Sequence, residues 1–316
     1  MNTRILALLA ATMAIPAFAG TVPAAKNPIA PPPPVDPWAS ARRPITNPTM
    51  FDMALARTNI HPIVMTQSIP DKVNTILGDL PAGGDFQLYA LQAEYAFNER
   101  LSLVAVKDGY IDFNGEGIFT SDDGWANLGA GLKYVFLLKP ESGYAMSGTA
   151  TVEIPTGDDD VWQGEGDGAI NLILNNLKLA GPWQFASSLG AHVPFSDSDS
   201  TLAFFSGHVS YAVTEKFMPL VELNWYHVLN SGNGDSRFPA QVGGAVPAVA
   251  TFEGGDLINL GAANGDDNAD IVTVAAGFRY LLTKNVELGA AFELPLTTES
   301  DNLMEYRITA DLVWKF

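Results

Sequence analysis

The chain ends in MEYRITADLVWKF, residues Met304 to Phe316, and this stretch decides the fold. Its even-numbered positions form a face without charge: Met304, Tyr306, Ile308, Ala310, Leu312, Trp314 and Phe316. The odd-numbered positions carry four charges, at Glu305, Arg307, Asp311 and Lys315. Successive side chains of a β-strand point to opposite faces of its sheet. The pattern therefore predicts a strand with one face in an apolar medium and the other in water, as in the wall of a transmembrane barrel.

The N-terminus predicts export. Arg4 is followed by an apolar run over residues 5–15 and then by Ala17-Phe18-Ala19, a small-x-small cleavage site. We expect residues 1–19 to be a secretory signal peptide, because the apolar run is shorter than the roughly 18–20 residues of a membrane-spanning helix. No later apolar run reaches that length, so the choice lies between a soluble exported protein and a barrel.

Composition excludes several classes of function. The 316 residues carry a formal net charge of −18 and no cysteine. Nucleic acid is excluded as a partner because phosphate binding needs a basic surface, and the lack of cysteine excludes disulfides and thiolate metal sites. The four histidines lack metal-ligand spacing, and no phosphate-binding or dinucleotide motif is present. We therefore expect no cofactor and no metal.

A proline-rich segment over residues 20–49 separates the signal peptide from the patterned region. It contains the run Pro31 to Pro34 and the pair Arg42-Arg43. Such a stretch prefers an extended polyproline form and has little apolar surface to bury. The sequence favours a disordered periplasmic spacer. The alternatives are a tether that binds a periplasmic partner and a plug that enters a lumen.

Residues 50–316 break into about twelve segments with period-2 patterning, which predict strands. They cover roughly residues 56–66, 85–97, 100–113, 125–138, 143–154, 167–178, 183–194, 201–213, 217–229, 270–282, 285–297 and 303–316. Tight turns such as Asn98-Glu99 and Glu215-Lys216 alternate with mostly longer loops that are rich in Asp and Gly. This sorting is typical of an all-β, transmembrane, antiparallel up-and-down barrel with short periplasmic turns. An even number of strands places both termini on one side, and together with the terminal Phe316 it predicts that the N- and the C-terminus are periplasmic.

The C-terminal strand and the aromatic residues support an outer-membrane location. The ending Thr309-x-Asp311-x-x-Trp314-x-Phe316 resembles the C-terminal signal of bacterial outer-membrane barrels, although Gly is usual where Asp311 stands. The resemblance implies that Trp314 and Phe316 form an assembly signal for the barrel-assembly machinery. Many Tyr, Trp and Phe residues lie beside the short turns, as in the aromatic girdle that contacts outer-membrane lipid and lipopolysaccharide.

Polar residues on the inward face of the strands predict the lining of the lumen. The predicted lumen residues are Glu94, Lys133, Glu153, Glu222, Asn224, Arg279, Glu287, Glu293, Glu305, Arg307, Asp311 and Lys315. Acids outnumber bases, which favours cations or neutral polar solutes over anions. The alternative is that these charges only hydrate and brace the interior.

Two features of this barrel are irregular. The connection over residues 230–269 is long and partly apolar, so it either folds inward or forms a mobile surface loop. Lys107 and Asp108 are adjacent in one strand, so strict alternation points one of them at lipid. We predict a bulge at Asp108-Gly109, or a Lys107 that reaches the membrane interface.

Candidate sites for chemistry are weak. His208 and Ser210 share one face of a strand, as in some outer-membrane lipid hydrolases, but the sequence places no supporting acid. Hydrogen-bonded lumen residues are the favoured interpretation. The runs Asp158-Asp159-Asp160 and Asp266-Asp267 could bind calcium or bridge lipopolysaccharide through divalent ions, although solvated turns are favoured.

Several motifs resemble the outer-membrane family named after the meta-pathway of phenol degradation. They are the run from Tyr89 to Phe97, Arg100-Leu101-Ser102-Leu103, Lys107-Asp108-Gly109-Tyr110 and Glu153-Ile154-Pro155-Thr156-Gly157-Asp158. The resemblance spans about residues 50–316 and does not include the proline-rich segment. It implies diffusion or uptake of small molecules, aromatic ones among them, and it supplies no catalytic residues.

The sequence therefore predicts a porin-like, non-enzymatic channel for small solutes. One alternative is a closed structural or surface-interaction barrel that acts through its outer loops. A minor alternative is an outer-membrane lipid hydrolase at His208 and Ser210.

Overall fold

A computed structural model describes residues 36–316, so the expected signal peptide and residues 20–35 lie outside the described residues. Among the described residues, no helix has the length and apolar character needed to cross a membrane. The strands are β1 (Asn59–Ser68), β2 (Lys72–Val73), β3 (Leu80–Pro81), β4 (Gly84–Ala96), β5 (Leu101–Lys107), β6 (Tyr110–Gly115), β7 (Asp122–Trp125), β8 (Leu128–Lys139), β9 (Tyr144–Ile154), β10 (Ala169–Ala180), β11 (Trp183–Pro194), β12 (Thr201–Tyr211), β13 (Phe217–Asn230), β14 (Asp270–Leu281), β15 (Val286–Pro295) and β16 (Tyr306–Lys315). Short 3-10 turns lie at η1 (Pro140–Ser142), η2 (Asp159–Val161), η3 (Val242–Gly244), η4 (Val246–Ala248) and η5 (Glu299–Asp301).

The strands of residues 36–316 close into one antiparallel barrel. β1 pairs with β16 on one side and with β4 on the other, which joins the two edges of the sheet. β5 and β6 both pair with β4 and occupy one position in the wall, and β7 and β8 share the next. The wall therefore has 12 strand positions, as the sequence predicts. β2 and β3 form a separate small hairpin.

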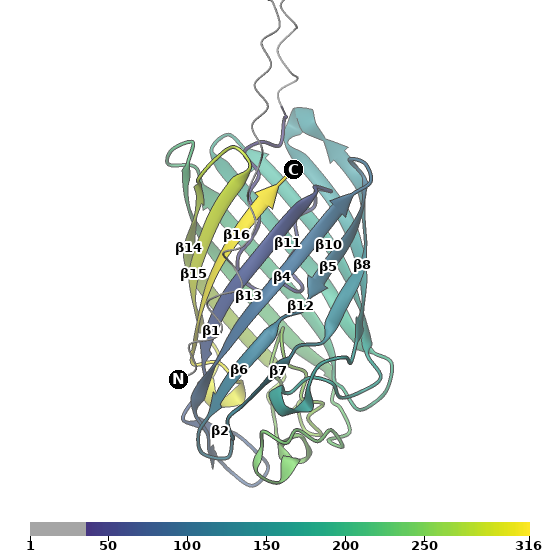
Figure 1. The fold of residues 1–316 in the computed structure, drawn as a ribbon, viewed down its shortest axis with the longest axis vertical. Coiled ribbons are helices and arrows are strands. Elements are labelled where there is room, and N and C mark those ends of the chain that lie inside the picture. Colours follow the sequence, from purple (N-terminus) through teal and green to yellow (C-terminus); the bar gives the residue numbers. More distant parts are fainter. Residues whose placement is uncertain (1–35) are drawn as a thin grey trace, which may run out of the picture. The chain divides into compact units, whose positions relative to one another are not determined.

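The two faces of the wall differ as the alternation predicts. In β16, Trp314 is 41% exposed and Ile308 44%, whereas Arg307 on the other face is 1% exposed. Figure 1 shows the C-terminus at one end of the barrel and the longer connections at the opposite end. We call these the turn end and the loop end.

The predicted irregularity at Asp108-Gly109 is confirmed. β5 ends at Lys107, β6 begins at Tyr110, and the pairing with β8 shifts register between Ala105 and Lys107. The Asp108 carboxylate accepts the Leu91 N–H at 2.9 Å and so replaces a ladder hydrogen bond. Lys107 turns inward and pairs with Glu153 at 2.6 Å, so the bulge keeps the ammonium away from lipid.

Gly109 is expected to be essential to this bulge. Its φ is 129°, and a Cβ there would lie 2.7 Å from the Leu88 side chain and 2.9 Å from the Tyr89 carbonyl oxygen. We expect Gly109→Ala to lower the free energy of unfolding by about 1–3 kcal/mol through backbone strain. Urea unfolding in lipid vesicles, followed by tryptophan fluorescence, measures the change. The control is Gly148→Ala, because a Cβ at Gly148 meets nothing within 4 Å. Equal effects of the two substitutions would contradict the assignment.

Residues 37–58, which we call the plug, occupy the interior of the barrel. Ile45 packs against Leu220 and Ala275 of the wall, and Met50 packs against Phe204. Trp38, Phe51, Met53, Ala54 and Leu55 form a third cluster with wall residues Ala145, Leu177 and Ala186. The favoured interpretation of residues 20–49 as a spacer is therefore wrong for residues 37–49. These residues continue without a boundary into the chain that follows residue 50.

The long connection between β13 and β14 folds inward at the loop end, which is the first of the two interpretations left open by the sequence. Its apolar residues join the largest buried cluster, together with Phe86, Phe113 and Trp162. The buried loop members of this cluster are Phe238, Ala240, Val246, Ala250, Phe252, Leu257, Ile258, Leu260 and Ala262. The lumen is thus occupied by the plug and covered by this loop.

Candidate functional site

The wall holds the plug mainly by its backbone. Gln184 of β11 accepts the Arg42 N–H at 2.8 Å and donates to the Arg42 carbonyl at 2.6 Å. Arg279 of β14 donates to the carbonyls of Arg43 and Pro44, each at 2.7 Å. Buried backbone groups must find hydrogen-bond partners, and an irregular segment has none of its own. Gln184 and Arg279 therefore supply hydrogen-bond partners for backbone groups of the plug, which forms no regular secondary structure.

Glu222 of β13 binds the next two residues of the plug. Its carboxylate accepts the N–H of Ile45 at 3.0 Å and the N–H of Thr46 at 2.7 Å, and it also accepts the Thr46 hydroxyl at 2.7 Å. Asn224 of the same strand donates to Thr46 Oγ1 at 3.0 Å. Hydrogen bonds to an ionised carboxylate are stronger than neutral ones, so Glu222 is a strong anchor of the plug.

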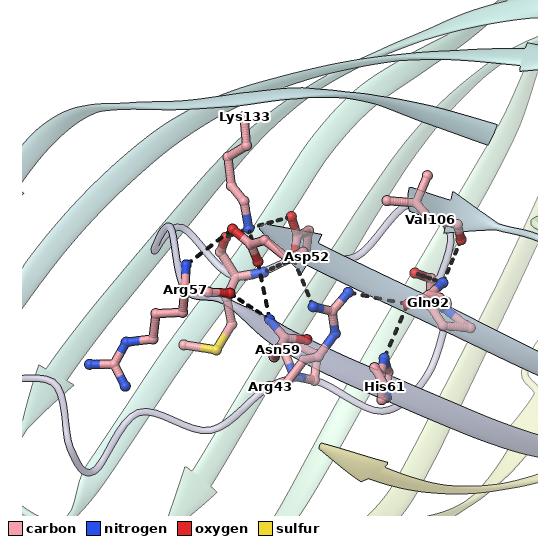
Figure 2. A network of polar contacts seen from close by, with 12 residues as sticks. Arg43, Asp52, Arg57, Asn59, His61, Gln92, Val106 and Lys133 are labelled. Carbon is pink, nitrogen blue, oxygen red and sulfur yellow. Dashed lines mark hydrogen bonds and ion pairs between the residues drawn. The ribbon is translucent and has the colours of Figure 1, made fainter. Parts of the chain in front are cut away.

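Buried ion pairs hold the returning half of the plug. Figure 2 shows Lys133 of β8 and Arg43 beside Asp52 of the plug, with separations of 2.7 and 3.4 Å. Lys133 also pairs with Glu94 of β4 at 3.0 Å. Removing one member of such a buried pair leaves an uncompensated charge, which costs about 3–5 kcal/mol. The network thus joins Asp52 to Lys133 of the wall and to Arg43 in the first half of the plug.

The path of the plug follows from its contacts. Near the turn end, Arg42 lies 3.4 Å from Glu287 of β15, and Lys315 donates to the Ala41 carbonyl at 3.4 Å. At the far point of the path, Thr49 donates to the carbonyl of Asp256 in the inward loop at 3.3 Å. The chain then returns to the turn end, where Thr58 accepts the Phe316 N–H. The plug therefore enters and leaves at one end of the lumen.

The loop is anchored inside the wall by a second ion pair. Arg307 of β16 donates to both carboxylate oxygens of Asp256, at 2.9 and 3.1 Å, and all these groups are buried. Arg307 also donates to Gln67 of β1 at 2.8 Å. A bidentate pair of this kind fixes geometry as well as charge. The ion pair therefore holds the loop against the inner face of the wall at β16.

Most of the predicted lumen residues lie inside. The inward set is Glu94, Lys133, Glu153, Glu222, Asn224, Arg279, Glu287, Glu293, Arg307, Asp311 and Lys315, all buried except the half-buried Lys315. Glu305 is a wrong prediction, because it precedes β16 at the loop end, is exposed, and accepts the Ser68 hydroxyl at 2.7 Å. Trp314 and Phe316 point outward, and their role as an assembly signal stays a prediction.

Sequence reasoning missed the polar residues that complete the network. These residues include Gln184, Gln92 and His61. Their side chains are buried and point inward, but they carry no formal charge and so did not stand out in the sequence. His61 lies 2.7 Å from Asp311, which itself pairs with Arg279. Alternation within β1, β4 and β11 was the signal that could have found them. The plug partners Arg42, Arg43 and Asp52 had no such signal.

His208 and Ser210 gain the acid that the sequence did not supply. His208 Nε2 lies 2.9 Å from Ser210 Oγ, and His208 Nδ1 lies 2.7 Å from Glu222. This order of groups is that of a nucleophile, a base and an acid. However, all three side chains are buried, and Glu222 also binds the plug. The arrangement fits the favoured interpretation of hydrogen-bonded lumen residues.

The acidic runs serve local structure. Asp158 accepts the Trp125 N–H at 2.6 Å, and Asp266 accepts the Ser231 hydroxyl at 2.8 Å. In the described part of the chain, no group of three or more His, Cys, Asp or Glu residues is arranged to hold a metal ion. Calcium binding at these runs stays a proposal without geometric support.

Comparison with solved structures agrees with this architecture. The COG4313 outer membrane channel from Pseudomonas putida F1 has a TM-score of 0.58 and 13% identity to this chain, over 87% of this chain and 100% of the other. The chain therefore shares the closed β-barrel fold of this outer-membrane channel. The NanC porin (TM-score 0.46, 8% identity, 82% of this chain and 100% of the other) and the KdgM porin with disordered oligogalacturonate (0.45, 9%, 81% and 99%) are also similar. No protein-family model and no curated protein matches the chain.

Proposed function

We propose that this outer-membrane barrel is a channel for the passive passage of small solutes, and that the plug and the inward loop close it in the described state. The observation that carries the proposal is the nature of the filling. A barrel of 12 strands has a lumen wider than that of eight-stranded barrels, which wall side chains fill. Here the filling is the segment before β1 and a loop, both of which can move without breaking the wall.

The charge of the interior supports a preference among solutes. The plug carries Arg42, Arg43 and Arg57 against one acid, Asp52. When the plug leaves, Glu222 and Glu287 lose partners and face water. The open lumen is then more negative than the closed one, which favours cations and neutral solutes over anions.

Liposome swelling tests this function. A variant without residues 37–58 should admit neutral and cationic solutes of the size of a monosaccharide faster than anions of equal size. The matched control is the same variant with Glu222→Gln and Glu287→Gln, in which the charge preference should shrink. Failure of every solute to cause swelling would contradict the channel.

Filling of the lumen also favours a second function, a closed barrel that acts through its outer loops. In that case removal of the plug would unfold the barrel or leave it impermeable. We also propose that the chain belongs to the phenol meta-pathway family and that aromatic molecules are among its solutes. Its termini would be periplasmic, and the proline-rich segment would bind a periplasmic partner. The barrel would contact lipopolysaccharide, and the barrel-assembly machinery would insert it by recognising Trp314 and Phe316. The minor alternative of a lipid hydrolase predicts that His208→Ala abolishes lipid hydrolysis, and its buried Ser210 argues against it.

A further inference from the structure

A small cavity lies at the loop end, between the wall and the inward loop. Trp162, His192, Asp199 and Asp256 are among its lining residues. Its enclosed space is about 30 Å³, which is room for about two water-sized groups. A ligand must therefore present a small head group, while the rest of it extends through the mouth. The half-buried Glu165 and Asp199 both line the cavity.

His192 presents a hydrogen-bond acceptor to this cavity. The Asn171 amide nitrogen donates to Thr151 Oγ1 at 3.3 Å, so its oxygen faces His192 Nδ1 at 2.8 Å. Nδ1 is then the protonated nitrogen, and Nε2 keeps a lone pair. The ring is 5% exposed, and Nε2 has no hydrogen-bond partner within residues 36–316. The ring lines the cavity, so Nε2 can accept a hydrogen bond from a donor bound there.

The charge of the cavity is negative after internal pairing. Glu153 pairs with Lys107, and Asp256 pairs with Arg307, so these carboxylates are neutralised. The Asp199 side chain has no hydrogen-bond partner in the described part of the chain. The cavity therefore offers the unpaired carboxylate of Asp199 and the lone pair of His192 Nε2. Among the described residues that line it, the one lysine, Lys107, is already paired with Glu153.

We propose that this cavity binds the ammonium head group of small primary amines. An ammonium group is about the size of water, carries the opposite charge to Asp199, and has three donors of which one suits His192 Nε2. The inference rests on the proposed channel function for its role, which would be capture of amine solutes at the entrance. Binding itself does not require an open lumen.

The experiment measures binding of ethylammonium to the full-length protein in detergent by saturation-transfer NMR. Ethylammonium should bind, whereas acetate and ethanol should not, and tetramethylammonium should bind at least about tenfold more weakly because it has no N–H donor and exceeds the cavity. Asp199→Asn should weaken binding about tenfold or more. The matched control is Asp197→Asn, which removes the same charge from an exposed position of the same loop.

Dependence on pH gives an independent check. Burial near Glu253 and Glu153 raises the pKa of Asp199 to about 7. A group with a raised carboxyl pKa is charged only above that value, so binding should strengthen as the pH rises through about 7 and should lose this dependence in Asp199→Asn. The charged and titratable groups around Asp199 are Glu253, Glu153, Glu165, Asp256, Lys107 and His192.

The results distinguish failure of the amine site from failure of the proposed channel. Equal binding by Asp199→Asn and Asp197→Asn, or no binding of ethylammonium, overturns the amine site. His192→Leu is a second variant, which should weaken ethylammonium binding while its circular dichroism spectrum stays that of the barrel. Conductance of the variant without the plug tests the channel separately. Amine binding without conductance would refute the channel and keep the site.

Discussion

Removal of residues 37–58 is expected to raise the mean conductance of the protein about a hundredfold in planar lipid bilayers. The plug is held by buried pairs such as Asp52–Lys133 and by the hydrogen bonds of Glu222. If these contacts favour the closed state by only about 2.8 kcal/mol, about 1% of the molecules are open at any time. Deletion removes this equilibrium, and the conductance of every molecule becomes that of the open lumen.

The control for this prediction is deletion of residues 20–35, which keeps the plug and should leave the conductance low. A milder variant is Gln184→Ala, which removes both hydrogen bonds to Arg42 and should give brief openings. Full-length protein and the plug deletion with the same conductance would show that the plug does not close the pathway. A deletion variant that does not conduct would contradict both this prediction and the proposed channel.

Arg307→Met is expected to release the inward loop. Met has a similar length but no charge, so the buried Asp256 carboxylate loses its bidentate partner. Removal of one member of a buried pair costs about 3–5 kcal/mol, and the loop can avoid that cost by moving Asp256 into water. We expect proteases to cleave between residues 231 and 268 at least about a hundredfold faster than in the wild type, since about 2.8 kcal/mol is two powers of ten.

Limited proteolysis followed by mass spectrometry measures this release. The matched control is Arg237→Met, which changes an exposed arginine of the loop whose side-chain hydrogen bonds within residues 36–316 go to the nearby carbonyls of Gly234 and Ser236. If both variants are cleaved at the wild-type rate, the pair between Arg307 and Asp256 does not hold the loop.

The wall could be predicted from the sequence because side chains along each strand alternate between its two faces. Each strand separates lipid from a polar interior, so the period of two in residues 304–316 already contained the inward Arg307 and Asp311. Glu305 follows the same parity but lies beyond the end of the strand, where alternation no longer has a physical cause. Errors at strand ends are therefore expected from a pattern alone.

The acid beside His208 illustrates a finer limit. His208 and Glu222 are direct partners in the pairing of β12 with β13. A two-residue turn at Glu215-Lys216 would have placed His208 opposite Leu223, one residue out of register. Both strands must keep their charged face inward, so an inward residue of one strand can only lie opposite an inward residue of the other. In both strands the inward residues have even numbers, so the alternation already favoured Glu222 over Leu223 as the partner of His208.

The sequence offered a plug only as an alternative to a spacer, and it could not predict the contacts of the plug, because this segment has no period. Its backbone is satisfied by side chains of the wall that are distant in sequence, such as Arg279, more than two hundred residues away. Arg42-Arg43 has the pattern of a solvated charge pair, and only the folded wall supplies Glu287 and Asp52 as partners. For the loop between β13 and β14, the sequence left inward folding as one of two interpretations, because its burial depends on residues of β4 and β6 that are distant in sequence.

The seam between β1 and β16 has a consequence for biogenesis. These strands lie near opposite ends of the chain, and contacts so distant in sequence form late because loop closure is slow. The plug ends directly before β1, so the step that seals the cylinder also encloses the plug. In the proposed channel, a newly closed wall would therefore already contain its plug. Opening would then be a later event, in which the plug leaves a wall that is already complete.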